Sequence, residues 1–407
     1  MATFPRVGMY SLGFATAADG TQHVLFNEGL AERVVHGACA ERCADPASWS
    51  MTTLASTDSL GVTAVGAEGL GFDSSGRLHV LISGVPPFGG SANRAVYATC
   101  AGDCTNGSSW TLLDLTPVAQ GNPIGTNGTF MVSADGSLAF LTQGQRNSFP
   151  SRYVGCTSGC GAISAWTGAS VLDGNPLFAR RDAEGVIHIV FDQGVTDSGD
   201  GLHFYGRCAS GCAQSSGWEI SPLGFIYRSG GHTAGFAVTP SGKVFLAYNQ
   251  GNAAAATEDN GKLFINSCTG ANCLDLGTWG SFSVGALGDG SDGAALSADG
   301  EVLRLANTSG FELHLRTCAG GGCQNAAGWS APGVIDSSAQ MNEAVPPDLG
   351  SACPGTSESA SWWPNLPAIG AGASGVVVGH APYAIVKCPG VASPGRYPSI
   401  GRIYATF

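Results

Sequence analysis

Short apolar runs recur along the chain, and a polar turn of the Ser/Asp-x-Gly kind stands ahead of each one. An apolar, glycine-rich stretch comes before the turn, so each copy predicts two antiparallel strands joined by a tight turn. The copies, in chain order, read AADGTQHVLF, DSSGRLHVLI, SADGSLAFLT, DAEGVIHIVF, TPSGKVFLAY, SADGEVLRLA and, more loosely, GASGVVVGHA.

A cysteine–tryptophan signature, C-x(3–4)-C-x(5)-W, follows six of these strand pairs. The close cysteine pairs are Cys39 with Cys43, Cys100 with Cys104, Cys156 with Cys160, Cys208 with Cys212, Cys268 with Cys273 and Cys318 with Cys323, and the tryptophans are Trp49, Trp110, Trp166, Trp218, Trp279 and Trp329. One module is then strand A, turn, strand B, loop, strand C ending in Cys, and strand D carrying Trp. Four strands in about 50–60 residues are typical of a propeller blade.

The sequence therefore predicts an all-β fold, a seven-bladed β-propeller with four-stranded antiparallel blades. We expect a single domain over residues 1–407, with approximate blades 6–56, 57–117, 118–172, 173–224, 225–285, 286–335 and 336–407. The seventh module differs, because a long insertion over 336–367 contains Trp362 and no close cysteine pair is present. The last strand, over 401–407, is expected to complete this blade, and whether Thr3–Pro5 also clasps it is left open.

The cysteine pairs indicate disulfides rather than zinc sites. Zinc needs four converging ligands, which pairs spread around a repeat array do not supply. Disulfides imply an oxidising compartment, so we expect a secreted protein, extracellular or periplasmic, in its mature form because Met1–Pro5 is not a signal-peptide start. The leftover Cys353 and Cys388 are expected to form a longer bridge. The tryptophans are interpreted as blade packing, with sugar stacking as the alternative.

Charge narrows the range of partners. The formal net charge is −12, with three lysines (Lys243, Lys262 and Lys387). Nucleic acid and anionic membranes reward clustered basic residues, so neither is expected as a partner. No apolar run reaches the length of a membrane span. A small-molecule or glycan ligand and a monomeric state are expected.

The modules resemble secreted bacterial propellers of the sialidase-like, Asp-box-related type. The likeness rests on the blade period and on the turns Ser133–Gly136 and Ser297–Gly300, which approach an Asp box. This resemblance implies the propeller fold, and fold alone does not carry function across.

A ring of divergent polar residues is predicted where the A strands begin. Alignment of the turns on their glycines gives Ser11, Glu68, Asn127, Asn175, His232, Asp292 and Asn365. Carboxylate and amide oxygens suit calcium, with zinc as a poorer match, so Glu68, Asn127, Asn175 and Asp292 are candidate metal ligands and His232 a candidate base. The ring resembles in kind the central calcium site of the paraoxonase and gluconolactonase propellers. The alternative is that polar residues simply line a channel mouth.

A second ring is predicted at the ends of the B strands. It comprises Asn27, Glu28, Gln143, Asp192, Gln193, Asn249, Gln250, Asn307 and His380. Together with Asn365, Trp362 and tyrosines such as Tyr248, these amides and carboxylates are candidate contacts for sugar hydroxyls. A lyase would need a His/Tyr acid–base pair and an arginine, for which His232, Tyr248, Arg180 and Arg181 are the candidates, and strand alternation is expected to turn one arginine toward the channel.

Three functions remain open from the sequence. A metal-dependent hydrolase of phosphoester, ester or lactone bonds is preferred, a carbohydrate-active propeller (lectin, glycosidase or polysaccharide lyase) is the alternative, and a structural or adhesive surface module is the third. The recurrent His23, His79 and His188 are interpreted as structural hydrogen-bonding residues rather than as a metal cluster. No organic cofactor is expected, because no phosphate-cradling glycine loop leads into a helix.

Overall fold

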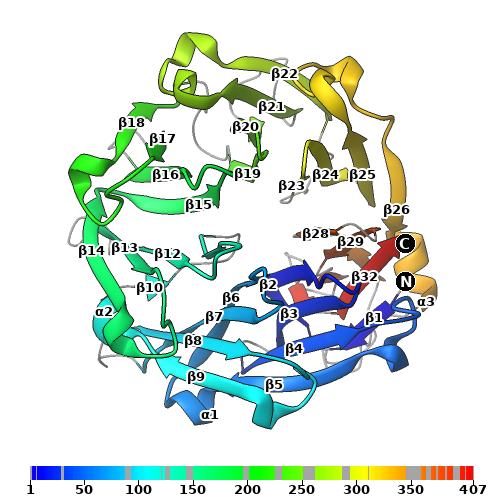
Figure 1. Ribbon diagram of the computed structural model, residues 1–407. Helices are drawn as coiled ribbons and strands as arrows, with labels where there is room; N and C mark the ends of the chain where they lie inside the picture. Colours follow the sequence, from blue (N-terminus) through cyan, green and yellow to red (C-terminus); the bar gives the residue numbers. More distant parts are fainter. Residues whose placement is uncertain are drawn as a thin grey trace.

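The chain is a seven-bladed β-propeller, with blades of four antiparallel strands around a central axis (Figure 1). The computed structural model describes residues 2–5, 7–28, 32–87, 93–120, 122–123, 129–143, 150–195, 201–224, 232–250, 262–286, 294–309, 311–344, 359–363, 368–372, 375–380, 383–387, 395–398 and 400–406.

The strands of the first six blades follow one another along the chain. They are β2 (Val7–Thr16), β3 (Gln22–Glu28), β4 (Arg33–Cys39) and β5 (Ser50–Ser56) in blade 1; β6 (Ala64–Phe72), β7 (Leu78–Val85), β8 (Arg94–Cys100) and β9 (Trp110–Asp114) in blade 2; β10 (Asn122–Pro123), β11 (Met131–Val132), β12 (Leu138–Gln143), β13 (Ser151–Cys156) and β14 (Trp166–Leu172) in blade 3; β15 (Asn175–Arg181), β16 (Ile187–Val195), β17 (Gly201–Cys208) and β18 (Glu219–Pro222) in blade 4; β19 (His232–Val238), β20 (Lys243–Gln250), β21 (Lys262–Thr269) and β22 (Gly280–Ala286) in blade 5; and β23 (Ala294–Asp299), β24 (Val302–Ser309), β25 (Glu312–Cys318) and β26 (Gly333–Ser337) in blade 6.

Blade 7 is closed by both ends of the chain. Its strands, from the axis outward, are β28 (Ala368–Gly372), β29 (Gly375–His380), β32 (Ile400–Thr406) and β1 (Ala2–Pro5). The N-terminal strand pairs with β32, with Ala2 opposite Ile403, which answers the question left open by the sequence. A separate three-stranded sheet is formed by β27 (Ser359–Trp363), β30 (Tyr383–Lys387) and β31 (Gly395–Pro398). The short α-helices are α1 (Thr57–Leu60), α2 (Thr116–Ala119) and α3 (Ser338–Ala344).

The A–B turns explain why Asp and Gly recur together. Six of the aligned turn glycines have positive φ, a conformation that side-chain-bearing residues rarely adopt; they are Gly20, Gly76, Gly136, Gly185, Gly242 and Gly300. The aspartate ahead of the glycine caps the turn: the Asp73 carboxylate accepts hydrogen bonds from the backbone N–H groups of Ser75 (2.9 Å) and Arg77 (3.0 Å). These turns are therefore a local property of the sequence.

Six disulfides join the close cysteine pairs, which confirms the prediction. They link Cys39 to Cys43, Cys100 to Cys104, Cys156 to Cys160, Cys208 to Cys212, Cys268 to Cys273 and Cys318 to Cys323. Cys43 and Cys273 are fully buried, whereas Cys212 is partly exposed. Each of these three packs in a cluster with the tryptophan of its own module, so the bridge and the indole form one unit. Cys353 and Cys388, the predicted longer bridge, lie outside the described residues.

The tryptophans complete the signature. Each indole N–H donates to the carbonyl of the second cysteine six residues earlier, for example from Trp166 to Cys160 at 2.9 Å, which accounts for the fixed spacing. Five of the six tryptophans are buried between blades, which supports packing over sugar stacking. Among the described residues, no helix is long and apolar enough to cross a membrane.

Candidate functional site

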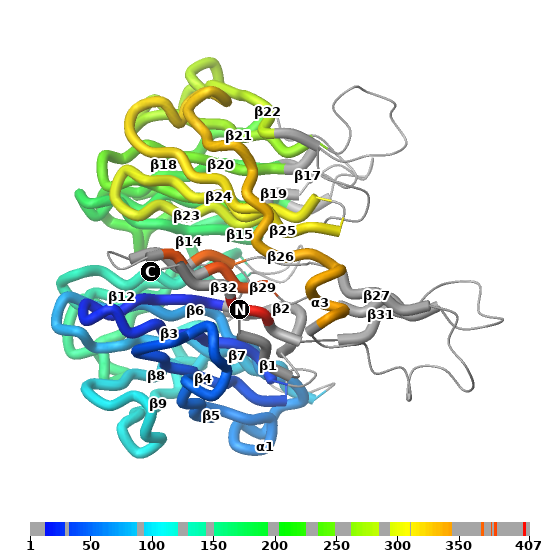
Figure 2. Tube along the Cα trace, turned by 90° about the vertical axis from the view of Figure 1, so that its right-hand side faces the viewer, coloured from blue at the N-terminus to red at the C-terminus, as the bar shows by residue number. Residues whose placement is uncertain are grey.

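The propeller has two faces that differ in chemistry. The face with the A–B turns and the disulfide hairpins is called the turn face, and the face with the D–A and B–C connections is called the loop face. Figure 2 views the ring from the side, with α3 at the loop face. Strands A and C begin at the loop face and strand B ends there, so the described residues of both predicted polar rings lie on this side.

A β-bulge shifts the level of the first ring. In blades 2, 4 and 5 the A strand bulges eight residues before the turn glycine, and Glu68 is the bulged residue of blade 2. Asn175 and His232 lie two residues nearer the loop face, where they pair with Asp192 and Asn249. The residues of the aligned ring therefore lie at different levels along the axis. The alignment missed this shift because the bulge cannot be seen in the sequence.

Glu68 and Asn27 are both occupied by contacts inside the ring. The Glu68 carboxylate is buried and accepts a hydrogen bond from the Ser83 hydroxyl. The Asn27 amide bridges blades 1 and 2, donating to the Val65 carbonyl (2.9 Å) and accepting from the Ala67 N–H (2.8 Å). These groups hold the inner strands of blades 1 and 2 together around the bulge.

Blade 4 brings two predicted site residues into contact. Asn175, Asp192 and His203 stand opposite one another on strands A, B and C, so their side chains share one face of the sheet. The Asn175 amide donates to the Asp192 carboxylate at 3.0 Å, and all three residues are partly exposed. An amide, a carboxylate and an imidazole therefore form a row, the blade 4 row, at the loop face. Gln193 follows it and is exposed.

The blade 4 row lies on the side of blade 4 that faces blade 5, and Tyr248 lies on the side of blade 5 that faces blade 4. Two residues beyond His203 along β17, Tyr205 packs against blade 5 in a cluster that also contains Tyr248. Tyr248 is 3% exposed and stacks on Phe264, with ring centroids 5.6 Å apart. The same arrangement occurs in blade 4 between Phe191 and Phe204 at 5.3 Å. The Tyr248 ring thus belongs to the interblade core, below the level of the blade 4 row.

Blade 6 has polar residues where blades 4 and 5 have this stacked pair. Its A–B turn has two residues, whereas blades 1 to 5 have five, which shifts strand B by one position. Asn307 and His314 therefore take the places of Phe191 and Phe204. The side-chain oxygen of Asn307 and Nδ1 of His314 are both buried, and neither has a hydrogen-bond partner among the described residues. Burial lowers the pKa of His314. The interface between blades 5 and 6 therefore contains unsatisfied polar atoms near the loop face.

Arg180 and Arg181 lie at the opposite end of β15 from the blade 4 row. Arg181 reaches blade 3, where its guanidinium donates to the Ser133 hydroxyl and, at 2.9 Å, to the Ser137 hydroxyl. The Arg180 guanidinium donates to the Ala179 carbonyl, and burial lowers the Arg180 pKa to about 10. Strand alternation turns Arg181 toward a neighbouring blade. Both arginines lie at the turn-face end of β15, whereas Tyr248 lies near the loop-face end of β20, and the His232 side chain lies outside the described residues.

The recurrent histidines are held in hydrogen-bonded chains. His79 lies 3.1 Å from Asp73 and 2.7 Å from the Tyr97 hydroxyl, and His188 repeats these distances with Asp182 and Tyr205. His23 instead contacts His36 at 2.9 Å. These contacts fit the structural role expected from the sequence.

The remaining predicted residues are placed only in part. Asn127, Asp292 and Asn365 lie outside the described residues. Asn249 pairs with Leu263 in blade 5, and Trp362 pairs with Ala384 in the separate three-stranded sheet, which belongs to none of the seven blades. In the part of the chain that the structure describes, no three His, Cys, Asp or Glu side chains form a metal-binding group. Calcium therefore stays a prediction.

Sequence reasoning missed two features of the loop face. One is His203, which counting back five residues from the strand C cysteine would have found. The other is a buried cluster between blades 6 and 7, where Asp336 accepts from Arg402 (2.6 and 3.1 Å) and lies 2.8 Å from His380 Nε2. Burial works to raise the Asp336 pKa, but bonds from His380 and Arg402 hold it below its usual value.

Comparisons establish the fold and no family. No known family matches the sequence, and no curated protein does. An ulvan lyase bound to -[GlcA(1-4)Rha3S]- is 12% identical, with a TM-score of 0.52 over 98% of this chain and 95% of its own. The polysaccharide lyase Uly1 is 10% identical, with a TM-score of 0.50 over 98% and 90%.

Two further similar structures belong to longer chains. A Hadza microbial sialidase is 13% identical, with a TM-score of 0.46 over 74% of this chain and 64% of its own, and a prolyl endopeptidase is 10% identical, at 0.46 over 96% and 50%. At such identities, likeness shows the fold alone. None of the four is described as a paraoxonase or gluconolactonase, so that resemblance stays an expectation.

Proposed function

We propose that this protein is a carbohydrate-active propeller that holds a glycan at the loop face, between blades 4 and 5. The blade 4 row carries the proposal: Asn175, Asp192 and His203 present an amide, a carboxylate and an imidazole side by side. These groups donate and accept hydrogen bonds at short range, which is what a polyhydroxylated ligand requires. Two similar propellers that align over nearly the whole of both chains support this class of ligand, because both are polysaccharide lyases.

The row also contains the groups that acid–base chemistry on a sugar needs. The bond from Asn175 fixes one oxygen of the Asp192 carboxylate, and Asp192 stands directly opposite His203 across the strand ladder. A carboxylate beside an imidazole raises the basicity of the imidazole and orients it. In our proposal, Asp192 and Asn175 position the sugar and His203 accepts or returns the proton.

A polysaccharide panel tests the proposal. Wild-type protein is incubated with acidic and neutral polysaccharides, and binding, released reducing ends and the ultraviolet absorbance of unsaturated sugars are followed. We expect at least one polysaccharide to bind, and Asp192→Asn and His203→Gln to weaken binding or turnover by about tenfold or more, the loss of one well-placed contact.

The matched control is Arg207→Gln, at the turn-face end of the same strand as His203, where the side chain pairs with exposed Glu219 at 3.1 Å. This variant should bind as the wild type does. A blank panel, or equal losses in all three variants, would overturn the proposal.

A further inference from the structure

We propose that a second sugar site lies on the turn face, in a groove between blades 5 and 6. The choice of a sugar rests on the proposed function, but the groove shares no residue with the blade 4 row. It has a volume of about 310 Å³, which is within the range of small-ligand sites. Its lining residues are Ser267, Cys268, Thr269, Asn272, Thr278, Gly280 and Gln324.

The groove arises from an irregularity in the repeat. The paired cysteines of blades 1 to 4 are four residues apart, whereas those of blades 5 and 6 are five apart. The extra residue in blade 5 makes an additional 3-10 turn over Gly270–Leu274, which carries Asn272 to the edge of the groove. Gln324 directly follows the second cysteine of the longer loop in blade 6 and closes the other side.

Gly280 keeps the groove open. It is the residue after the module tryptophan, and the other five modules have a side chain there: Ser50, Thr111, Thr167, Glu219 and Ser330. A Cβ on Gly280 would meet the Ser267 hydroxyl at 3.9 Å, an ordinary contact distance. A side chain at this position is therefore sterically allowed and would project into the groove, so its absence is particular to this blade.

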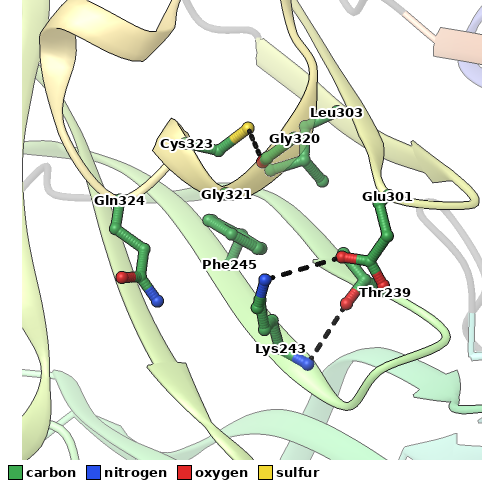
Figure 3. A pocket seen from close by; sticks show the side chains of 9 residues that line it. All are labelled: Thr239, Lys243, Phe245, Glu301, Leu303, Gly320, Gly321, Cys323 and Gln324. Atoms are coloured by element: carbon green, nitrogen blue, oxygen red, sulfur yellow. Dashed lines mark hydrogen bonds and ion pairs between the residues drawn. The ribbon is translucent and has the colours of Figure 1, made fainter.

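A smaller cavity lies beside the groove and shares one lining residue with it. It has room for about one water molecule (about 10 Å³), and Figure 3 shows the residues that line it. One of them, Gln324, also lines the groove. Across the smaller cavity, the Lys243 ammonium of blade 5 lies 3.7 Å from the Glu301 carboxylate of blade 6. The Ser241 hydroxyl and N–H lower the Glu301 pKa, which keeps this carboxylate charged. The ion pair holds the two turns together next to Gln324.

The lining chemistry selects a neutral polyhydroxylated ligand. The groove offers the exposed hydroxyls of Thr269 and Thr278 and the amides of Asn272 and Gln324, beside the buried Ser267, and none of its lining side chains is charged. The Thr278 hydroxyl donates to the backbone carbonyl of Asn272 (2.6 Å), so its oxygen is left to accept a hydrogen bond from a ligand. Hydroxyls and amides match sugar hydroxyls, while an ion would find no counter-charge.

The test titrates neutral gluco-, manno- and galacto-oligosaccharides into protein labelled for NMR. We expect at least one oligosaccharide to shift the amide signals of Thr269, Asn272 and Gln324. Gly280→Thr should weaken this binding by about tenfold or more, because it fills the groove, and Gln324→Ala should weaken it less. Ser330→Thr, the same position in blade 6, is the matched control and should bind as the wild type does.

The Asp192→Asn variant separates the two sites, because it should weaken binding at the loop face and leave the shifts of the groove signals unchanged. If the loop face binds no sugar but the groove signals still shift and respond to Gly280→Thr, the groove stands and the proposed function of the loop face fails. No shift of the groove signals with any oligosaccharide, or equal shifts in the wild type and in folded Gly280→Thr, would overturn the groove proposal.

Discussion

The turn face and the loop face are built from the same modules, yet they use them in opposite ways. At the turn face, each of six modules repeats one disulfide and one bond from tryptophan to cysteine, and the aspartates cap their turns. At the loop face, equivalent positions hold Ser83 in blade 2, Asp192 in blade 4 and Asn249 in blade 5. Repeated contacts maintain the ring, and positions free to differ are where one asymmetric site can arise.

The largest expected effect on stability belongs to the repeated contacts. Trp166→Ala should lower the free energy of unfolding by about 3–5 kcal/mol, because a buried aromatic and its bond to Cys160 are lost together. Urea denaturation measures this loss. Ile163→Ala, three residues earlier on the exposed rim, should change stability by less than about 0.5 kcal/mol. A loss below about 1 kcal/mol for Trp166→Ala would contradict the assigned role.

Blade 1 breaks the repeat with a histidine pair, which should make it sensitive to acid. Burial lowers the pKa of His23 to about 4, and burial with the neighbouring His23 lowers that of His36 to about 3. The unfolded chain therefore takes up protons first as the pH falls below 6.5. The contribution of the neutral histidine pair to the free energy of unfolding is fully present above that pH. It is lost as the pH falls toward 4, by about 3 kcal/mol for His23 alone.

His36→Tyr tests this source of acid sensitivity. Tyr97 and Tyr205 occupy the same position, three residues before the first cysteine, in blades 2 and 4. Urea denaturation at pH 7 and pH 4.5 gives the loss of stability on acidification. This loss should be smaller in the variant than in the wild type, by at least about 1 kcal/mol. His203→Gln at the loop face is the control, and an unchanged pH dependence in His36→Tyr would refute the assignment.

The sequence predicts the repeated half of the molecule much better than the other half. Blade number, turns and disulfides follow from local patterns, because each contact spans a few residues. The bulge at Glu68 and the two-residue turn before Val302 are not visible in the pattern, so alignment by turn glycine misplaced parts of the polar rings. The clasp by Ala2–Pro5 depends on a pairing across the whole chain, which no local signal records.

The disulfides should contribute less than the tryptophans beside them. Replacing Cys100 and Cys104 together with serine removes a disulfide that closes a loop of only a few residues. The free energy of unfolding should therefore fall by about 2 kcal/mol at most. The bond from Trp110 to the Cys104 carbonyl uses backbone and should survive. Urea denaturation compares this variant with Trp110→Ala, and a greater loss from the serine pair would reverse the order of the two contributions.

The smallest change in stability is expected where the loop face departs from the packing of its neighbours. Asn307 and His314 replace a stacked aromatic pair, and the buried Asn307 oxygen has no hydrogen-bond partner in the part of the chain that the structure describes. Asn307→Leu should therefore leave stability unchanged or raise it by up to about 1 kcal/mol, since an unsatisfied polar group is exchanged for an apolar one. If glycan binding falls in this variant while the fold gains stability, the polar pair serves the ligand and not the ring. A loss above about 2 kcal/mol would instead place Asn307 among the contacts that hold the blades together.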